Sequence, residues 1–132
     1  MYPAGAARYR EVEVLTMHPA QRVVLLYGHL LAHLRISRAL TESREFETRA
    51  ERLCRAMEIV EELAVSLDHE AGGAIAGNLQ SLYGYFLSEL IRLGRLSDPL
   101  AFDNPIRMIG ELHSAWAEAA AQVTSRESLS PA

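Results

Sequence analysis

Residues 66–85 decide the fold of this chain, and they read Ser-Leu-Asp-His-Glu-Ala-Gly-Gly-Ala-Ile-Ala-Gly-Asn-Leu-Gln-Ser-Leu-Tyr-Gly-Tyr. The first half of this stretch predicts a turn, because Gly72 and Gly73 tolerate backbone angles that side chains forbid. The apolar residues of the second half recur every three or four positions, at Ile75, Leu79 and Leu82, and the same spacing continues to Phe86. This spacing is typical of the buried face of a helix. A second periodic segment ends at Leu67, so the stretch predicts a helical hairpin around which the rest of the chain packs.

The composition is that of an ordinary globular chain of one domain. It has 132 residues, of which 49% are apolar and 23% charged, enough for a hydrophobic core without disulfides. Seventeen acidic residues and thirteen basic residues, all of them arginine, give a net charge of -4, so no nucleic-acid partner is expected. The sequence shows no secretory signal and no apolar run long enough to cross a bilayer, which predicts a cytoplasmic protein without direct membrane insertion. We interpret the single cysteine, Cys54, as a small buried or half-buried residue in a reducing compartment.

Four long helices are predicted, and proline and glycine mark several of their ends. Pro19 predicts the start of the first helix, because proline at the first helical position loses only a hydrogen bond that has no partner. Gly94 predicts the end of the third helix, and Asn104-Pro105 predicts a restart after a short turn over 99–103. The predicted helices cover residues 18–40, 44–67, 71–93 and 105–122. Helices of this length with short connections predict an all-α, antiparallel up-down-up-down four-helix bundle.

Two terminal segments flank this bundle, which spans residues 18–123. Residues 1–17 are predicted to be an N-terminal arm docked on the bundle, because aromatic and aliphatic residues make this segment too apolar for a solvated tail. Residues 124–132 are polar and end in Pro131-Ala132, which predicts a disordered tail.

Two predicted helices carry features beyond a core face. The first helix has Leu25, Leu26 and Ile36 outside its main apolar stripe, which indicates either burial on two sides or an exposed binding patch. The third helix has a strip of small residues on the side opposite its apolar face, formed by Gly77, Ser81, Gly84 and Ser88. An interior glycine costs about 0.8–1.0 kcal/mol relative to alanine. The strip therefore either lets a partner helix or peptide approach the backbone, or reflects tolerated variation on an exposed face.

The chain contains no recognisable catalytic or metal-binding motif. His29 and His33 are four residues apart on one helix, a spacing that can place two imidazoles on one metal. Bundle di-metal sites, however, need pairs of Glu-x-x-His, and Glu111-Leu112-His113 has the wrong spacing. No phosphate-binding loop and no nucleophile signature is present. We therefore predict no enzyme activity, no cofactor and no metal, and expect a binding protein.

Two stretches of the chain resemble the flagellin-specific export chaperones of the FliS family. The first is Val14-Leu15-Thr16-x-x-Pro19 followed by Val23-Val24-x-Leu26-Tyr27, and the second is the glycine-rich run of residues 66–85. Asp98-Pro99 and Trp116 also fall where that family has them, so the resemblance covers residues 2–119. The chain departs from the usual family pattern at Gly28, Ala74, Gly77 and Pro105.

The resemblance implies a cytoplasmic four-helix chaperone that binds the disordered C-terminal segment of flagellin in surface grooves. Binding would prevent premature polymerisation and aid flagellar type III export, with the membrane protein of the export gate as a second partner. The resemblance also implies an N-terminal arm that covers part of the groove and is displaced by flagellin.

We assign partner binding to apolar and small residues on the arm, the first helix and the third helix. The predicted partner-binding residues are Tyr9, Leu15, Leu25, Leu26, Leu30, Gly77, Ser81, Tyr83, Gly84, Tyr85 and Phe86. The alternative function is a helical adaptor that binds another amphipathic segment without catalysis. A metal-binding or ligand-binding bundle, resting on His29 and His33 alone, comes third. Exposed grooves of this kind also offer a route to a homodimer of the free protein.

Overall fold

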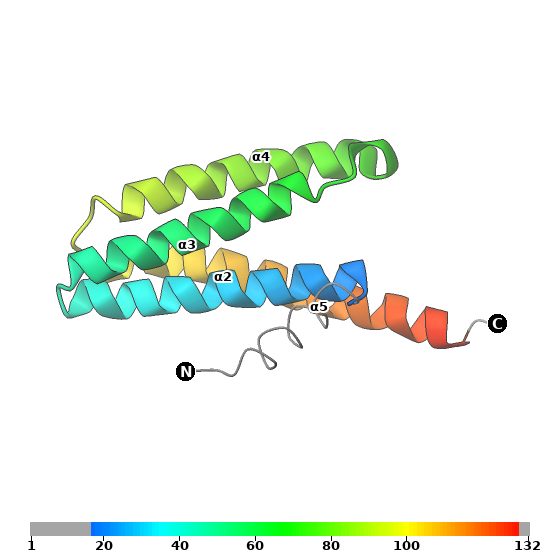
Figure 1. Ribbon diagram of the computed structural model, residues 1–132, viewed down its shortest axis with the longest axis horizontal. Coiled ribbons are helices and arrows are strands. Elements are labelled where there is room, and N and C mark those ends of the chain that lie inside the picture. Colours follow the sequence, from blue (N-terminus) through cyan, green and yellow to red (C-terminus); the bar gives the residue numbers. More distant parts are fainter. Residues whose placement is uncertain (1–16, 130–132) are drawn as a thin grey trace, which may run out of the picture.

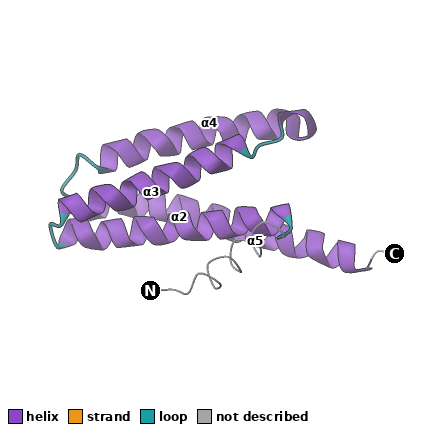
Figure 2. Ribbon diagram, viewed as in Figure 1, coloured by secondary structure: helices purple, strands orange, loops and turns teal. Residues whose placement is uncertain are grey.

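The computed structural model describes residues 17–129, which form four α-helices, one short 3-10 helix and no strand. The helices are α2 (Pro19–Glu42), α3 (Phe46–Val65), α4 (His69–Leu93) and α5 (Asp103–Leu129), and the 3-10 helix η1 (Pro99–Phe102) precedes α5. The prediction of an all-α fold with four helices is confirmed. Consecutive helices run in alternating directions along the long axis (Figures 1 and 2).

Local hydrogen bonds explain where these helices begin. Pro19 occupies the first turn of α2, and the His18 imidazole Nδ1 accepts a hydrogen bond of 3.1 Å from the backbone N–H of Ala20. The Asp68 carboxylate accepts hydrogen bonds from the first backbone N–H groups of α4, and Asp98 does the same for η1. Each start therefore satisfies N–H groups that the helix itself leaves unpaired.

α2 is the central helix of the bundle. It packs against both α3 and α5, whereas α4 packs along α3 (Figure 1). The buried core side chains come from all four helices and η1: Tyr27, Leu30, Leu34, Leu53, Val60, Leu63, Tyr83, Phe86, Leu90, Leu93, Phe102 and Ile109. Inside this core, the Tyr27 hydroxyl donates a hydrogen bond of 3.0 Å to the Tyr83 hydroxyl, and the Tyr27 and Trp116 ring centroids lie 6.3 Å apart. These contacts join α2, α4 and α5 across the bundle.

Arg49 in α3 is a buried residue that the sequence pattern did not single out. Its guanidinium donates hydrogen bonds to the carbonyl oxygens of Leu96 (2.6 Å) and Gly94 (3.0 Å) and to the Thr41 hydroxyl (3.2 Å). The same guanidinium lies 4.6 Å from the centre of the Phe46 ring. Arg49 thus connects the end of α2, the start of α3 and the segment that follows α4.

The predicted short turn before the last helix is present as η1 (Pro99–Phe102), and α5 begins at Asp103, two residues before the predicted start. Pro105 lies in its first turn, where a proline removes no intrahelical hydrogen bond. Other predictions made from the sequence are wrong in detail. α5 continues to Leu129, so residues 124–129 are helical and not a disordered tail. Cys54 is exposed and not buried. The predicted arm, residues 1–17, lies outside the described residues apart from Met17.

Candidate partner-binding surface

The outer face of α4 is an exposed helix surface without charged side chains. Residues 71–88 contain no Asp, Glu, Arg or Lys, although α4 packs along only one neighbouring helix backbone over most of its length. Gly77, Ser81 and Gly84 are all exposed on this face. A Cβ atom added at Gly77 or Gly84 would meet no atom within 4 Å. These glycines are therefore not required by packing inside the protein, and the small-residue strip leaves the α4 backbone accessible to a partner.

Apolar side chains border this strip. The side chain of Tyr85 is 44% exposed, and Ile91 is also exposed further along α4. The Tyr85 hydroxyl donates a hydrogen bond of 3.4 Å to Glu89, whose carboxylate also accepts one of 2.6 Å from Nε of Arg92. This hydrogen bond from Arg92 lowers the pKa of the Glu89 carboxyl, and so keeps the carboxylate ionised. Tyr85 and Glu89 are four residues apart and Glu89 and Arg92 are three apart, spacings at which side chains on a helix are neighbours.

Three of the predicted partner-binding residues belong to the core instead. Leu30 is 0% exposed, and Tyr83 and Phe86 are each 2% exposed. They pack among core residues of the other helices, so none of them offers an anchor on this surface. The prediction for these three is therefore corrected: Tyr83 and Phe86 pack α4 onto the bundle, and Leu30 is a core residue of α2.

The remaining predicted residues have different positions. Leu25 and Leu26 are half-buried on α2, while Tyr9 and Leu15 lie outside the described residues. Ile75, which the periodicity placed on the inner face of α4, is exposed, and Ala76 is buried in its place. The buried residues of α4 are Ala76, Tyr83, Phe86, Leu90 and Leu93, so the buried face is centred one position further along than Ile75 and Leu82.

A small hollow separates the start of α2 from the second half of α5. It has a volume of about 240 Å³ and is lined by Gln21, Val24, Ala117, Ala120 and Ala121. Its lining is mainly apolar and small, and it lies close in sequence to the point where residues 1–17 join α2.

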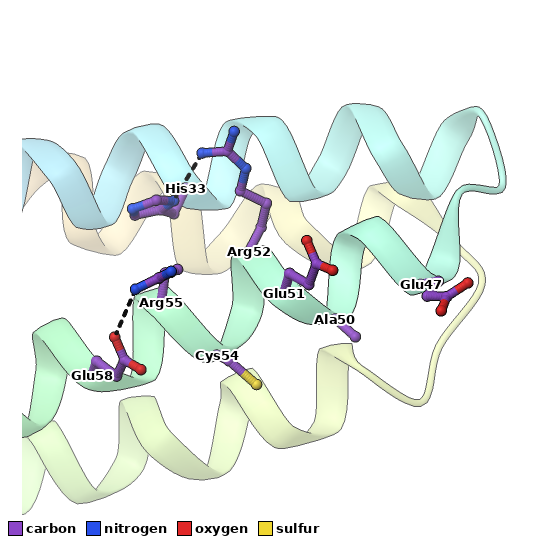
Figure 3. Close-up of a pocket in the computed structure, with 8 residues that line it drawn as sticks. All are labelled: His33, Glu47, Ala50, Glu51, Arg52, Cys54, Arg55 and Glu58. Carbon is purple, nitrogen blue, oxygen red and sulfur yellow. Dashed lines mark hydrogen bonds and ion pairs between the residues drawn. The ribbon is translucent and has the colours of Figure 1, made fainter. Parts of the chain in front are cut away.

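A second, polar hollow of about 820 Å³ lies on the outer side of α3, and Figure 3 shows its lining side chains. The His33 imidazole Nδ1 lies 3.5 Å from Nη1 of Arg52, and Arg55 forms an ion pair of 3.7 Å with Glu58. Burial, Arg52, His29 and Arg55 all lower the pKa of His33. No group of three possible metal ligands occurs among the described residues. The hollow is a charged surface, and nothing in its geometry indicates catalysis.

Within the described part of the chain, no helix is long and apolar enough to cross a bilayer. On the outer face of α4, exposed apolar side chains lie next to small residues that leave the helix backbone accessible. A surface of this kind can bind another polypeptide segment.

Comparison with known proteins identifies the family. The family description "Flagellar protein FliS" matches residues 1–123, nearly the whole chain. The chain belongs to the FliS family. The resemblance found in residues 14–27 and 66–85 is therefore confirmed.

Three relatives show how far the FliS similarity extends. The flagellar secretion chaperone FliS of Vibrio cholerae is 31% identical over 98 residues, which cover 74% of this chain and 72% of that protein. The flagellar secretion chaperone FliS of Salmonella typhimurium is 28% identical over 134 residues, covering 97% of this chain and 99% of that protein. The flagellar secretion chaperone FliSB of Pseudomonas aeruginosa is 28% identical over 106 residues, which cover 80% of this chain and 84% of that protein. FliS proteins are chaperones of flagellar export and not enzymes, in agreement with the absence of a predicted catalytic motif.

Proposed function

We propose that this FliS-family chain binds the C-terminal segment of flagellin in the cytoplasm and keeps it from polymerising before export. The observation that supports the proposal is the exposed, uncharged face of α4, residues 71–88. A disordered segment can fold into an amphipathic helix on such a face, where its apolar side meets Tyr85 and its backbone approaches Gly77 and Gly84.

The energetics favour a partner that folds as it binds. Ordering a disordered segment costs about 2–5 kcal/mol or more of the gross interaction energy, so the surface must offer apolar contact area. On α4 this area is provided by Tyr85 and Ile91, and the half-buried Leu25 and Leu26 provide further area on α2. The predicted arm would cover part of this area in the free protein, and the bound complex would then meet the export gate.

Calorimetric titration of the full chain with a flagellin peptide tests the proposal. A peptide of about 40 C-terminal residues of the flagellin from the same organism is long enough to form several helical turns on the bundle. We expect one-to-one binding with a large negative heat-capacity change, because apolar area is buried as the peptide folds.

Two variants locate the binding surface. Gly84→Leu fills the small-residue strip and should weaken binding by about tenfold or more, because one leucine keeps the partner from the backbone. Ala32→Leu adds the same side chain at an exposed position of α2 and should leave binding unchanged. Absence of heat with the wild-type chain would reject flagellin and favour the adaptor that binds another amphipathic segment. Sedimentation at rising concentration shows whether the free chain instead pairs with itself through this face.

A further inference from the structure

The connection between α3 and α4 forms one tip of the bundle, and it combines exposed apolar side chains with carboxylates. It lies at the opposite end of the bundle from the α2–α3 and α4–η1 connections (Figure 1). α3 ends at Val65 and α4 begins at His69, so only three residues join the two helices. We use the name hairpin-tip patch for Glu61, Val65, Glu70 and Ile75.

The two apolar members of the hairpin-tip patch are unusually exposed. The Val65 side chain is 86% exposed and that of Ile75 is 69% exposed, the two largest values among the large hydrophobic side chains described. Neither residue contributes to the core cluster, so the fold does not require an apolar side chain at either position. Exposed apolar side chains rimmed by polar groups are typical of protein interaction sites.

The charge around these side chains has one sign. No arginine or lysine occurs between Arg55 and Arg92, whereas six acidic residues fall in this interval: Glu58, Glu61, Glu62, Asp68, Glu70 and Glu89. Glu62 forms an ion pair of 2.7 Å with Arg22, and Asp68 caps α4. Among the described residues, no basic side chain pairs with Glu61 or Glu70.

We propose that the hairpin-tip patch is a docking site for a basic amphipathic segment of a second protein. Carboxylates on the rim attract lysine or arginine, and burial of Val65 and Ile75 provides the apolar contact. A second copy of this tip carries the same negative charge and is repelled, as is an anionic membrane. The chain's own arm does not complement it, because residues 1–17 contain as many glutamates as arginines.

Ile75 lies within residues 71–88, but on the side of α4 opposite Gly77 and Gly84. The hairpin-tip patch is therefore separate from the small-residue strip of the proposed function, and a probe peptide can distinguish the two. The probe is a fluorescently labelled leucine–lysine amphipathic peptide of about four helical turns, and its leucine–glutamate counterpart is the charge control. Fluorescence anisotropy with the full chain at about 0.15 M salt measures the affinity. We expect the wild-type chain to bind the leucine–lysine peptide and not the leucine–glutamate peptide.

Three double variants and one single variant locate the contact. Val65→Ser with Ile75→Ser, and separately Glu61→Gln with Glu70→Gln, should each weaken binding by about tenfold. Glu47→Gln with Glu51→Gln makes the same change of charge at the other end of α3, and should alter affinity by less than about twofold. Gly84→Leu should not affect this peptide, although it disrupts the surface of the proposed function.

Circular dichroism checks that every variant remains helical, which we expect because all the substituted positions are exposed. If the two pairs of glutamate substitutions, at the tip and at the other end of α3, weakened binding of the leucine–lysine peptide equally, the attraction would be a general effect of charge and the proposal would be overturned. Loss of binding in Gly84→Leu would place the peptide on α4 and would also overturn it. Failure of the wild-type chain to bind either peptide would overturn it as well.

Discussion

Arg49 shows how one buried cation can fix a connection between helices. It is 5% exposed and donates three hydrogen bonds, to Thr41, Gly94 and Leu96. Two of these acceptors are backbone carbonyls beyond the last helical residue of α4: Gly94 is its C-cap residue, and Leu96 lies two residues further. Arg49 therefore holds the segment that follows α4 against α3.

Replacing Arg49 should destabilise the fold. Arg49→Met keeps much of the side-chain volume but leaves the Gly94 and Leu96 carbonyls without their donor, which costs on the order of 2–3 kcal/mol. Arg95→Met, an exposed change of the same kind, should cost less than about 0.5 kcal/mol. Urea denaturation followed by circular dichroism measures both. Equal stability of the two variants would show that the hydrogen bonds of Arg49 contribute nothing to the fold.

His33 should make stability fall as the pH falls below neutrality. The pKa of His33 in the folded protein is lower than its ordinary value of 6.5, chiefly because of burial and then because of Arg52. The unfolded chain therefore takes up this proton first, so stability is full above pH 6.5 and is lost as the pH falls through 6.5 towards the folded pKa. We expect His33→Gln to lose less stability than the wild type between about pH 8 and about pH 5.5, measured by urea denaturation. At about pH 8 the difference in free energy of unfolding between the two proteins reports the change in packing alone. If the free energy of unfolding fell equally with pH in both proteins below that pH, the prediction would be wrong.

At the scale of elements, α4 contains glycines with opposite roles. Gly73 has a φ of 50°, which side chains rarely adopt, whereas Gly84 lies in regular helix with open space around it. Gly84→Ala should raise the free energy of unfolding by about 0.8 kcal/mol through helix propensity, while Gly73→Ala should lower it by about 1–3 kcal/mol through backbone strain. Thermal denaturation of the two variants measures these shifts. Destabilisation by Gly84→Ala would show a hidden packing role and would weaken the case for a partner surface.

The elements themselves were predictable from the sequence, but the faces they bury were less so. Pro19, Gly94, the Asn104-Pro105 pair and the apolar periodicity located all four helices, because capping and propensity act within a few residues. Ile75 was misplaced because apolar residues occupy adjacent positions of α4, and their spacing alone does not decide whether the stripe through Ile75 or the one through Ala76 and Tyr83 is buried. Leu30, Tyr83 and Phe86 were misassigned because an apolar residue on a helix looks the same in sequence whether it faces the core or a groove. The small-residue strip was found because glycines outside a turn are conspicuous.

At the scale of the whole molecule, the helices should differ in stability against local opening. α2 packs against α3, α5 and η1, whereas the first half of α4 buries only Ala76 fully. The second half of α4 buries Tyr83, Phe86, Leu90 and Leu93. We expect amide hydrogen exchange to be slowest in α2 and to slow progressively along α4 from its start to its end. Flagellin peptide should protect α4 most where the free protein exchanges fastest, and uniform exchange along α4 would contradict this gradient.

α4 is therefore held firmly at one end and loosely at the other. Arg49 fixes the residues just after Leu93, whereas the glycines near His69 and the sparse core contacts that follow leave the start of the helix free to pivot. A segment lying along α4 would meet a compliant surface beside Gly77 and a rigid one beside Ser88. We expect selectivity to be graded along this single helix, so that a partner can vary in side-chain size near the free end and must match closely near the fixed end.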